Sequence, residues 1–71
     1  MKKMYPGVQF VMPVPGSYAS GTFALISAVA LAIDNAGYNS AVFVAEAMTV
    51  DYENLKRLIN RSVEIVEHAT V

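Results

Sequence analysis

The chain has 71 residues, of which 55% are hydrophobic, and its formal net charge at pH 7 is −1. This length fits a single domain over residues 1–71, and this hydrophobic content excludes a disordered, fully solvated chain. The chain has no cysteine, which excludes small secreted scaffolds held by disulfides and any thiolate metal site. Because nucleic acids attract proteins through many Lys and Arg side chains, a nucleic-acid partner is not expected from this charge.

Neither a signal peptide nor a membrane span is expected in the N-terminal half of the sequence. Lys2 and Lys3 resemble the basic start of a signal peptide, but Pro6, Gly7 and later prolines interrupt the apolar block that should follow. The most apolar segment, residues 23–33, is shorter than the roughly 20 residues that span a bilayer. We therefore expect a cytoplasmic protein.

The first predicted element is a β-strand over residues 8–14. Its side chains are mostly β-branched or aromatic, and Gln9 is the only clearly polar one. This composition indicates a strand that is covered on both faces. Pro13 has no N–H for a ladder hydrogen bond, so it is expected at the end of the strand or on an edge.

A loop of small residues follows the strand. Backbone N–H groups in such a loop, next to a helix N-terminus, attract phosphate or carboxylate groups. The spacing Gly16-x-x-x-x-Gly21-Thr22 partly matches a P-loop, but Thr22 stands at the position of the P-loop lysine. The loop is therefore either a structural connection or a site for a small anionic ligand. In the second case the binding residues would be Gly16, Ser17, Ser20, Gly21 and Thr22.

A helix is predicted over residues 22–36. Ser20 or Thr22 is expected to cap its N-terminus, and Gly37 is expected to form the left-handed turn that ends it. No Asp, Glu, Lys, Arg or His lies between Lys3 and Asp34. A helix without a charged face needs cover on most sides, and 71 residues supply little cover.

This helix is therefore predicted to lie at a subunit interface. Alanines recur every four residues along it, which forms a stripe of small side chains that another backbone can approach closely. The predicted interface residues are Phe23, Ala24, Ala28, Ala32 and Ala36.

Residues 41–48 have two interpretations. Val42, Phe43 and Val44 favour a strand, whereas Ala45 to Met48 favour a helix. The strand is preferred, because a βαβ unit returns to its sheet through such a Val/Phe-rich segment. The fold class is then α/β, a small β-α-β-α domain. Since a stable sheet normally needs three or more strands, we expect homo-oligomerisation to complete it.

Glu46 is the carboxylate of greatest chemical interest. In the strand interpretation it lies among Val44, Met48 and other apolar residues, where burial would raise its pKa and could make it a general acid or base. Alternatively, Glu46 is exposed and pairs with Arg57 or Arg61.

No catalytic set, metal site or cofactor is predicted. The hydroxyls of Ser17, Ser20 and Thr22 have no evident activating base. The only histidine, His68, cannot form a metal site alone.

The last predicted element is an amphipathic helix that begins after Asp51. Asp51 is a favoured N-cap residue, and Glu53 is well placed near the positive end of the helix dipole and four residues before Arg57. The predicted apolar seam consists of Tyr52, Leu55, Ile59, Ser62 or Val63, and Val66. Lys56, Arg57 and Arg61 alternate with acidic residues, which predicts a mixed, solvated face.

If residues 41–48 form a helix, the order becomes strand, helix, helix. Residues 37–40 followed by 43–48, with Gln9-Phe10 before a proline, then resemble the ribbon-helix-helix repressors. That resemblance implies a β-α-α dimer whose paired strands enter the DNA major groove, with Gln9 contacting bases. Val11 and Pro13 depart from the family pattern, which has polar or basic residues at these positions.

The preferred function is a small non-enzymatic homo-oligomeric binding or structural module. Its expected partners are further copies of itself and a small anionic molecule at residues 16–22. The alternatives are a ribbon-helix-helix-like DNA-binding regulator and an enzyme that uses Glu46 at a subunit interface.

Overall fold

The computed structural model describes residues 2–14 and 16–66, which form a small mixed α/β domain. Two parallel strands and three α-helices are present in these residues, together with one turn of 3₁₀ helix. In chain order the elements are β1 (Gln9–Val11), the 3₁₀ turn η1 (Tyr18–Ser20), α1 (Thr22–Asn35), α2 (Ala41–Ala47), α3 (Tyr52–Ser62) and β2 (Glu64–Val66).

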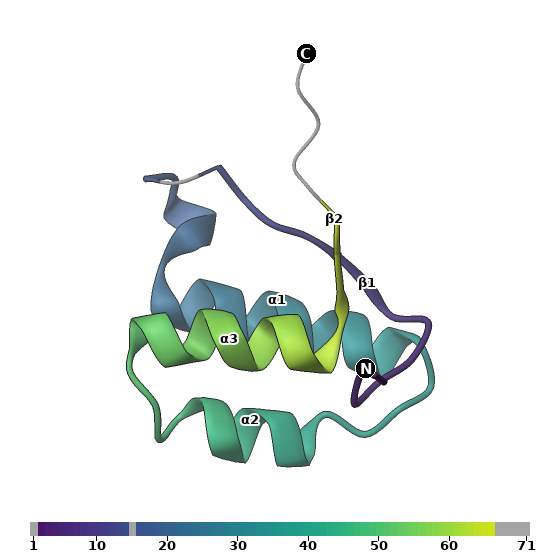
Figure 1. Ribbon diagram of the computed structural model, residues 1–71. Coiled ribbons are helices and arrows are strands. Elements are labelled where there is room, and N and C mark those ends of the chain that lie inside the picture. The colour runs from purple at the N-terminus through teal and green to yellow at the C-terminus, as the bar shows by residue number, and fades with distance from the viewer. Residues whose placement is uncertain (1, 15, 67–71) are drawn as a thin grey trace.

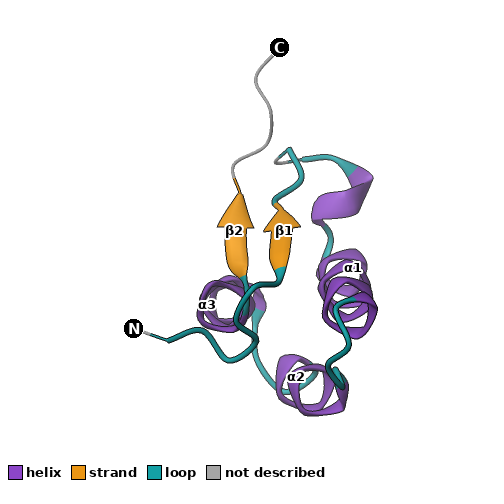
Figure 2. Ribbon diagram, turned by 90° about the vertical axis from the view of Figure 1, so that its right-hand side faces the viewer, coloured by secondary structure: helices purple, strands orange, loops and turns teal. Residues whose placement is uncertain are grey.

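The three helices surround the core, and the two strands lie side by side near α1 and α3, on the side away from α2 (Figure 1 and Figure 2). Figure 1 shows α2 running back beneath α1 and α3, and Figure 2 shows the helices nearly end-on with β1 and β2 side by side above them. The core lies between these elements, where apolar side chains from all three helices meet. The largest fully buried apolar side chains are Leu25, Val29, Ile33, Phe43, Leu55, Leu58, Ile59 and Val63.

The strand predicted over residues 8–14 is present, but it is shorter and the chain covers only one of its faces. Phe10 is buried, whereas its neighbours Gln9 and Val11 are exposed. This is the alternation of a strand with one covered face. The prediction of cover on both faces is therefore wrong for the single chain.

The second strand is β2 and not residues 41–48. It pairs with β1 in parallel, with Phe10 opposite Ile65. The Glu64 N–H donates to the Val8 carbonyl (2.8 Å), and the Met12 N–H donates to the Val66 carbonyl (3.2 Å). The pairing with β2 therefore extends one residue beyond each end of β1.

Residues 41–47 form helix α2, so the strand interpretation and the β-α-β-α order are wrong. Phe43 and Ala47, four residues apart, are buried, while Val42, Ala45 and Glu46 are exposed. Burial at this spacing is helical. The strand preference of Val42 and its neighbours is weak, and packing of one helical face against α1 and α3 overrides it.

The order of β1, α1 and α2 is that of the ribbon-helix-helix alternative. The arrangement differs from that family's, because β1 pairs in parallel with β2 of the same chain and α3 follows α2.

The predicted helix over residues 22–36 is confirmed as α1 within one residue at its end, and Gly37 has the left-handed φ of +93° expected there. The predicted caps are wrong, because Gly21 is the N-cap and no side chain accepts a hydrogen bond at this end. The Ser20 hydroxyl instead donates to the Ser17 carbonyl at 2.6 Å.

Helix α3 begins as predicted, since the Asp51 carboxylate accepts a hydrogen bond from the Asn54 N–H at 2.9 Å. It ends at Ser62, earlier than predicted, where Val63 turns the chain into β2. Glu53 pairs with Lys56 at 3.6 Å rather than with Arg57.

The N-cap of α3 supplies a first prediction. Replacing Asp51 with Ala leaves the Asn54 N–H without its acceptor, and we expect the free energy of unfolding to fall by about 1 kcal/mol. Urea denaturation followed by far-UV circular dichroism measures this loss. Asp51→Asn, which keeps an acceptor oxygen, should lose less; equal stability of Asp51→Ala and the wild type would contradict the cap.

The N-terminal segment caps the other end of α3. The hydrogen bonds run from Lys3 Nζ to the Asn60 carbonyl (2.6 Å), from the Met4 N–H to the Arg61 carbonyl (3.0 Å) and from the Tyr5 N–H to the Ser62 carbonyl (2.8 Å). The last carbonyls of a helix have no partner within the helix. Residues 3–5 are therefore held against the last turn of α3.

Candidate functional site

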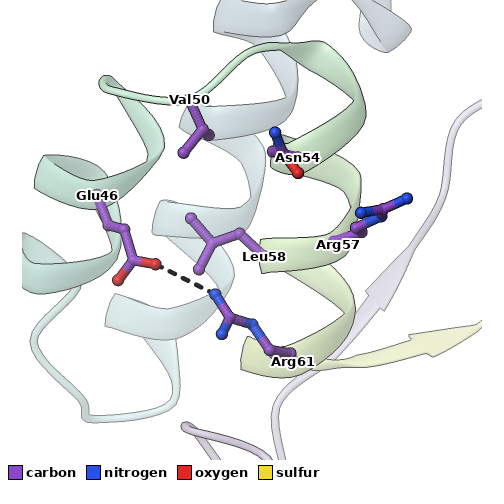
Figure 3. Close-up of a pocket in the computed structure, with 6 residues that line it drawn as sticks. All are labelled: Glu46, Val50, Asn54, Arg57, Leu58 and Arg61. Atoms are coloured by element: carbon purple, nitrogen blue, oxygen red, sulfur yellow. Dashed lines mark hydrogen bonds and ion pairs between the residues drawn. The ribbon is translucent and has the colours of Figure 1, made fainter.

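A groove between α2 and α3 has a volume of about 350 Å³ and is lined by Glu46, Val50, Asn54, Arg57, Leu58 and Arg61. Four of these residues lie on α3 at spacings of three and four, which places them on neighbouring positions of one helical face. Figure 3 shows Val50 and Leu58 pointing between the two helices. The groove therefore combines an apolar floor with charged and amide side chains at its rim.

Glu46 and Arg61 form an ion pair across this groove. Arg61 Nη2 lies 3.2 Å from Glu46 Oε2 (Figure 3), and both side chains are about half exposed. An exposed pair of this kind contributes only about 0–1 kcal/mol to stability. Of the two interpretations of Glu46, burial in a strand is not observed, and the exposed position with an ion pair to Arg61 is observed.

A second, smaller pocket lies next to the groove. It has a volume of about 180 Å³ and is lined by Lys2, Lys3, Met4, Asn60 and Arg61. Arg61 lines both cavities, so the two cavities adjoin at this side chain.

Every Lys and Arg of the chain belongs either to residues 2 and 3 or to α3. The hydrogen bond from Lys3 Nζ to Asn60, 57 positions along the chain, brings the two groups together. The sequence predicts a solvated face for the α3 cations, but it does not predict that Lys2 and Lys3 lie beside them. No local sequence pattern predicts this proximity, because residues 3–5 are held at α3 by hydrogen bonds to the carbonyl groups of its last turn.

Several polar groups of the predicted ligand loop, residues 16–22, form hydrogen bonds with other groups of the chain. The Ser17 hydroxyl donates to the Val14 carbonyl at 2.7 Å, and η1 fills the middle of the loop. The Tyr52 hydroxyl donates to the Ser20 carbonyl at 2.9 Å. Gly16 adopts a left-handed φ of +86°, as a turn requires. The last predicted ligand residue, Glu46, lies in the α2–α3 groove instead.

The predicted interface residues lie on the side of α1 that the chain leaves partly or fully uncovered. Phe23, Ala28 and Ala36 are exposed, and Ala24 and Ala32 are partly exposed. The opposite side packs into the core through Leu25, Ile26, Val29 and Ile33. Ser27 and Leu31 are exposed on the same side but were not among the predicted interface residues. They follow Phe23 by four and eight residues, and this helical spacing could have predicted that they share its face.

Residues 2–14 and 16–66 contain no cluster of three or more Asp, Glu or His side chains that could hold a metal ion, and His68 lies outside them. None of the helices in this described part combines the length and the apolar character needed to cross a membrane.

Comparison of the chain with protein-family models, with curated proteins and with solved structures finds no match in any of the three.

Proposed function

We propose that the chain is a non-enzymatic homo-oligomeric module that associates through one face of α1. This α1 outer face consists of Phe23, Ser27, Ala28 and Leu31, with Ala24 and Ala32 at its margin. The observation that carries the proposal is the exposure of large apolar side chains on a face without charge: Phe23 is 70% and Leu31 60% exposed.

The arrangement of the α1 outer face suits a second copy of the same chain. Phe23 and Leu31 each lie four residues from Ser27, so their side chains flank it on the same helical face. In an antiparallel pair related by a two-fold axis near Ser27, Phe23 of one copy meets Leu31 of the other, and the reverse. The small side chains of Ser27 and Ala28 let the two helices approach closely.

Charge also favours a second copy over a foreign partner. The α1 outer face has no ionisable group from residue 22 to residue 33, so it offers no charge pattern by which a different protein could be selected. Two identical uncharged faces do not repel each other.

The magnitudes indicate a moderate affinity. Full burial of Phe23 and Leu31 in both copies contributes at most roughly 6–12 kcal/mol. Association costs about 4–15 kcal/mol in lost freedom of motion. The largest gain with the smallest cost leaves about 8 kcal/mol, which corresponds to a dissociation constant near 1 μM. We therefore expect association no tighter than about micromolar, and sensitive to a single substitution.

Phe23→Glu is the test of this interface. The wild-type chain should sediment well above its monomer mass of 7.7 kDa at tens of micromolar, and Phe23→Glu should raise the dissociation constant at least about tenfold, because it buries an unpaired charge. Sedimentation equilibrium measures both. A wild-type monomer at these concentrations would refute the proposal.

Two matched variants separate a specific interface from a general effect of charge. Val42→Glu adds the same charge at an α2 side chain that is 64% exposed, and should leave association unchanged. Val11→Glu changes the outer face of β1, where Val11 is 58% exposed. Loss of association in Val11→Glu instead of Phe23→Glu would favour a second copy that packs on the outer face of the two-stranded sheet.

No observation favours the DNA-binding or enzymatic alternatives. Gln9, the expected base-contacting residue, lies in register with Glu64, whose negative charge opposes DNA phosphates. Glu46 is exposed and paired with Arg61.

A further inference from the structure

The cations around α3 are concentrated although the chain as a whole has a formal charge of −1. We define the basic site as Lys2, Asn54, Arg57 and Arg61, four of the polar side chains that line the two cavities adjoining at Arg61. Lys3 also lines one of these cavities, but its amino group is hydrogen-bonded to the Asn60 carbonyl. Among the described residues, neither Lys2 nor Arg57 forms an ion pair with a carboxylate.

We propose that the basic site binds a small phosphate-bearing molecule, with Arg57 and Arg61 as the principal ligands of the phosphate. Arg57 and Arg61 are four residues apart, one helical turn, and both line the groove. In Figure 3 the Arg61 guanidinium points across the groove toward Glu46, whereas the Arg57 guanidinium points away from it. Binding of one phosphate by both therefore requires the exposed Arg57 side chain to change rotamer and turn toward Arg61. A guanidinium group presents its N–H donors in a planar fork that matches phosphate oxygens. Asn54, one turn earlier on the same face, adds an amide donor.

The shape of the site favours a small molecule. The groove of about 350 Å³ lies at the lower end of the sizes typical of small-molecule sites. Val50 and Leu58 form an apolar floor for the part of the ligand that carries no charge. Glu46 and Glu53 lie beside the cations, and their charge opposes a long polyanion such as a nucleic acid.

Glu46 then competes with phosphate for Arg61. Its ion pair holds the Arg61 side chain across the groove. A phosphate that binds Arg61 must replace this carboxylate, which costs little because the pair is exposed. Removal of the Glu46 charge should therefore strengthen phosphate binding.

The test is a titration of the ¹⁵N-labelled full chain with pyrophosphate at constant ionic strength, followed by NMR shifts. Wild-type binding should saturate, with shifts centred on α3 and on residues 2–5. Arg57→Gln and Arg61→Gln should each weaken it about tenfold or more, as expected for the loss of charge-assisted hydrogen bonds, and Glu46→Gln should strengthen it a few-fold. All of the substituted side chains are exposed, so the spectra should retain the wild-type fold.

Lys56→Gln is the matched control. It removes one positive charge from α3 at a residue that lines neither cavity, and should leave the pyrophosphate affinity within about two-fold. Equal weakening by Lys56→Gln and Arg61→Gln, or shifts that never saturate, would overturn the proposal. A parallel titration with a mononucleotide and a single-stranded 12-mer completes the test; affinity that rises with strand length would identify a nucleic-acid surface and refute a small-ligand site.

Discussion

Phe43→Ala should unfold a large fraction of the molecules. Phe43 is the largest fully buried side chain, at 0% exposure, and it packs from α2 into the core formed with α1 and α3. Truncation of a buried Phe costs about 3–5 kcal/mol. Since small domains have total stabilities near the lower end of about 5–15 kcal/mol, this loss removes most of the margin.

Urea denaturation of Phe43→Ala and the wild type, followed by circular dichroism, measures this loss. The matched control is Val42→Ala at the neighbouring exposed position, which we expect to change the free energy of unfolding by less than about 0.5 kcal/mol. Similar stability of the two variants would contradict the packing of α2 against α1 and α3.

Asp34→Ala should have the second-largest effect, because its carboxylate joins α1 to α2. Asp34 Oδ1 accepts a hydrogen bond from the Ser40 N–H at 3.0 Å, and Oδ2 accepts one from the Ser40 hydroxyl at 3.1 Å. Ser40 is buried, so its donors lose their only hydrogen-bond acceptor in the described structure. We expect a loss of about 2 kcal/mol in the free energy of unfolding.

Chemical denaturation of three variants can test this junction. Asp34→Asn retains one oxygen acceptor and should lose less stability than Asp34→Ala. Asn35→Ala, at the adjacent exposed position on α1, should change stability by less than about 0.5 kcal/mol. A loss in Asn35→Ala as large as that in Asp34→Ala would show that the effect comes from α1 helicity and not from the contact with Ser40.

Features with local signals were predictable from the sequence. The apolar run of α1 with Gly37 after it, and the Asp51 cap of α3, each depend on residues within one helical turn. The side of α1 that the chain leaves uncovered was also predicted, since an uncharged helix in a short chain cannot be fully enclosed.

Residues 41–48 show why local preference failed. Val42 and Val44 favour strand and Ala45 to Ala47 favour helix, so the local preferences nearly cancel. The choice then depends on which partner is available. Phe43 and Ala47 can both reach the core only if they lie one helical turn apart, and α1 and α3 provide that surface.

The sequence by itself determined the position of α1, the start of α3 and the uncharged character of the α1 outer face. Only the tertiary structure decided that residues 64–66 form a strand, because β2 exists through its parallel pairing with β1, more than 50 positions away. It also decided the basic site, since Lys2 joins Arg61 only after residues 3–5 bind the last carbonyls of α3. The physical reason is the same in both cases: caps and helical periodicity act within a few residues, whereas these hydrogen bonds join the two ends of the chain.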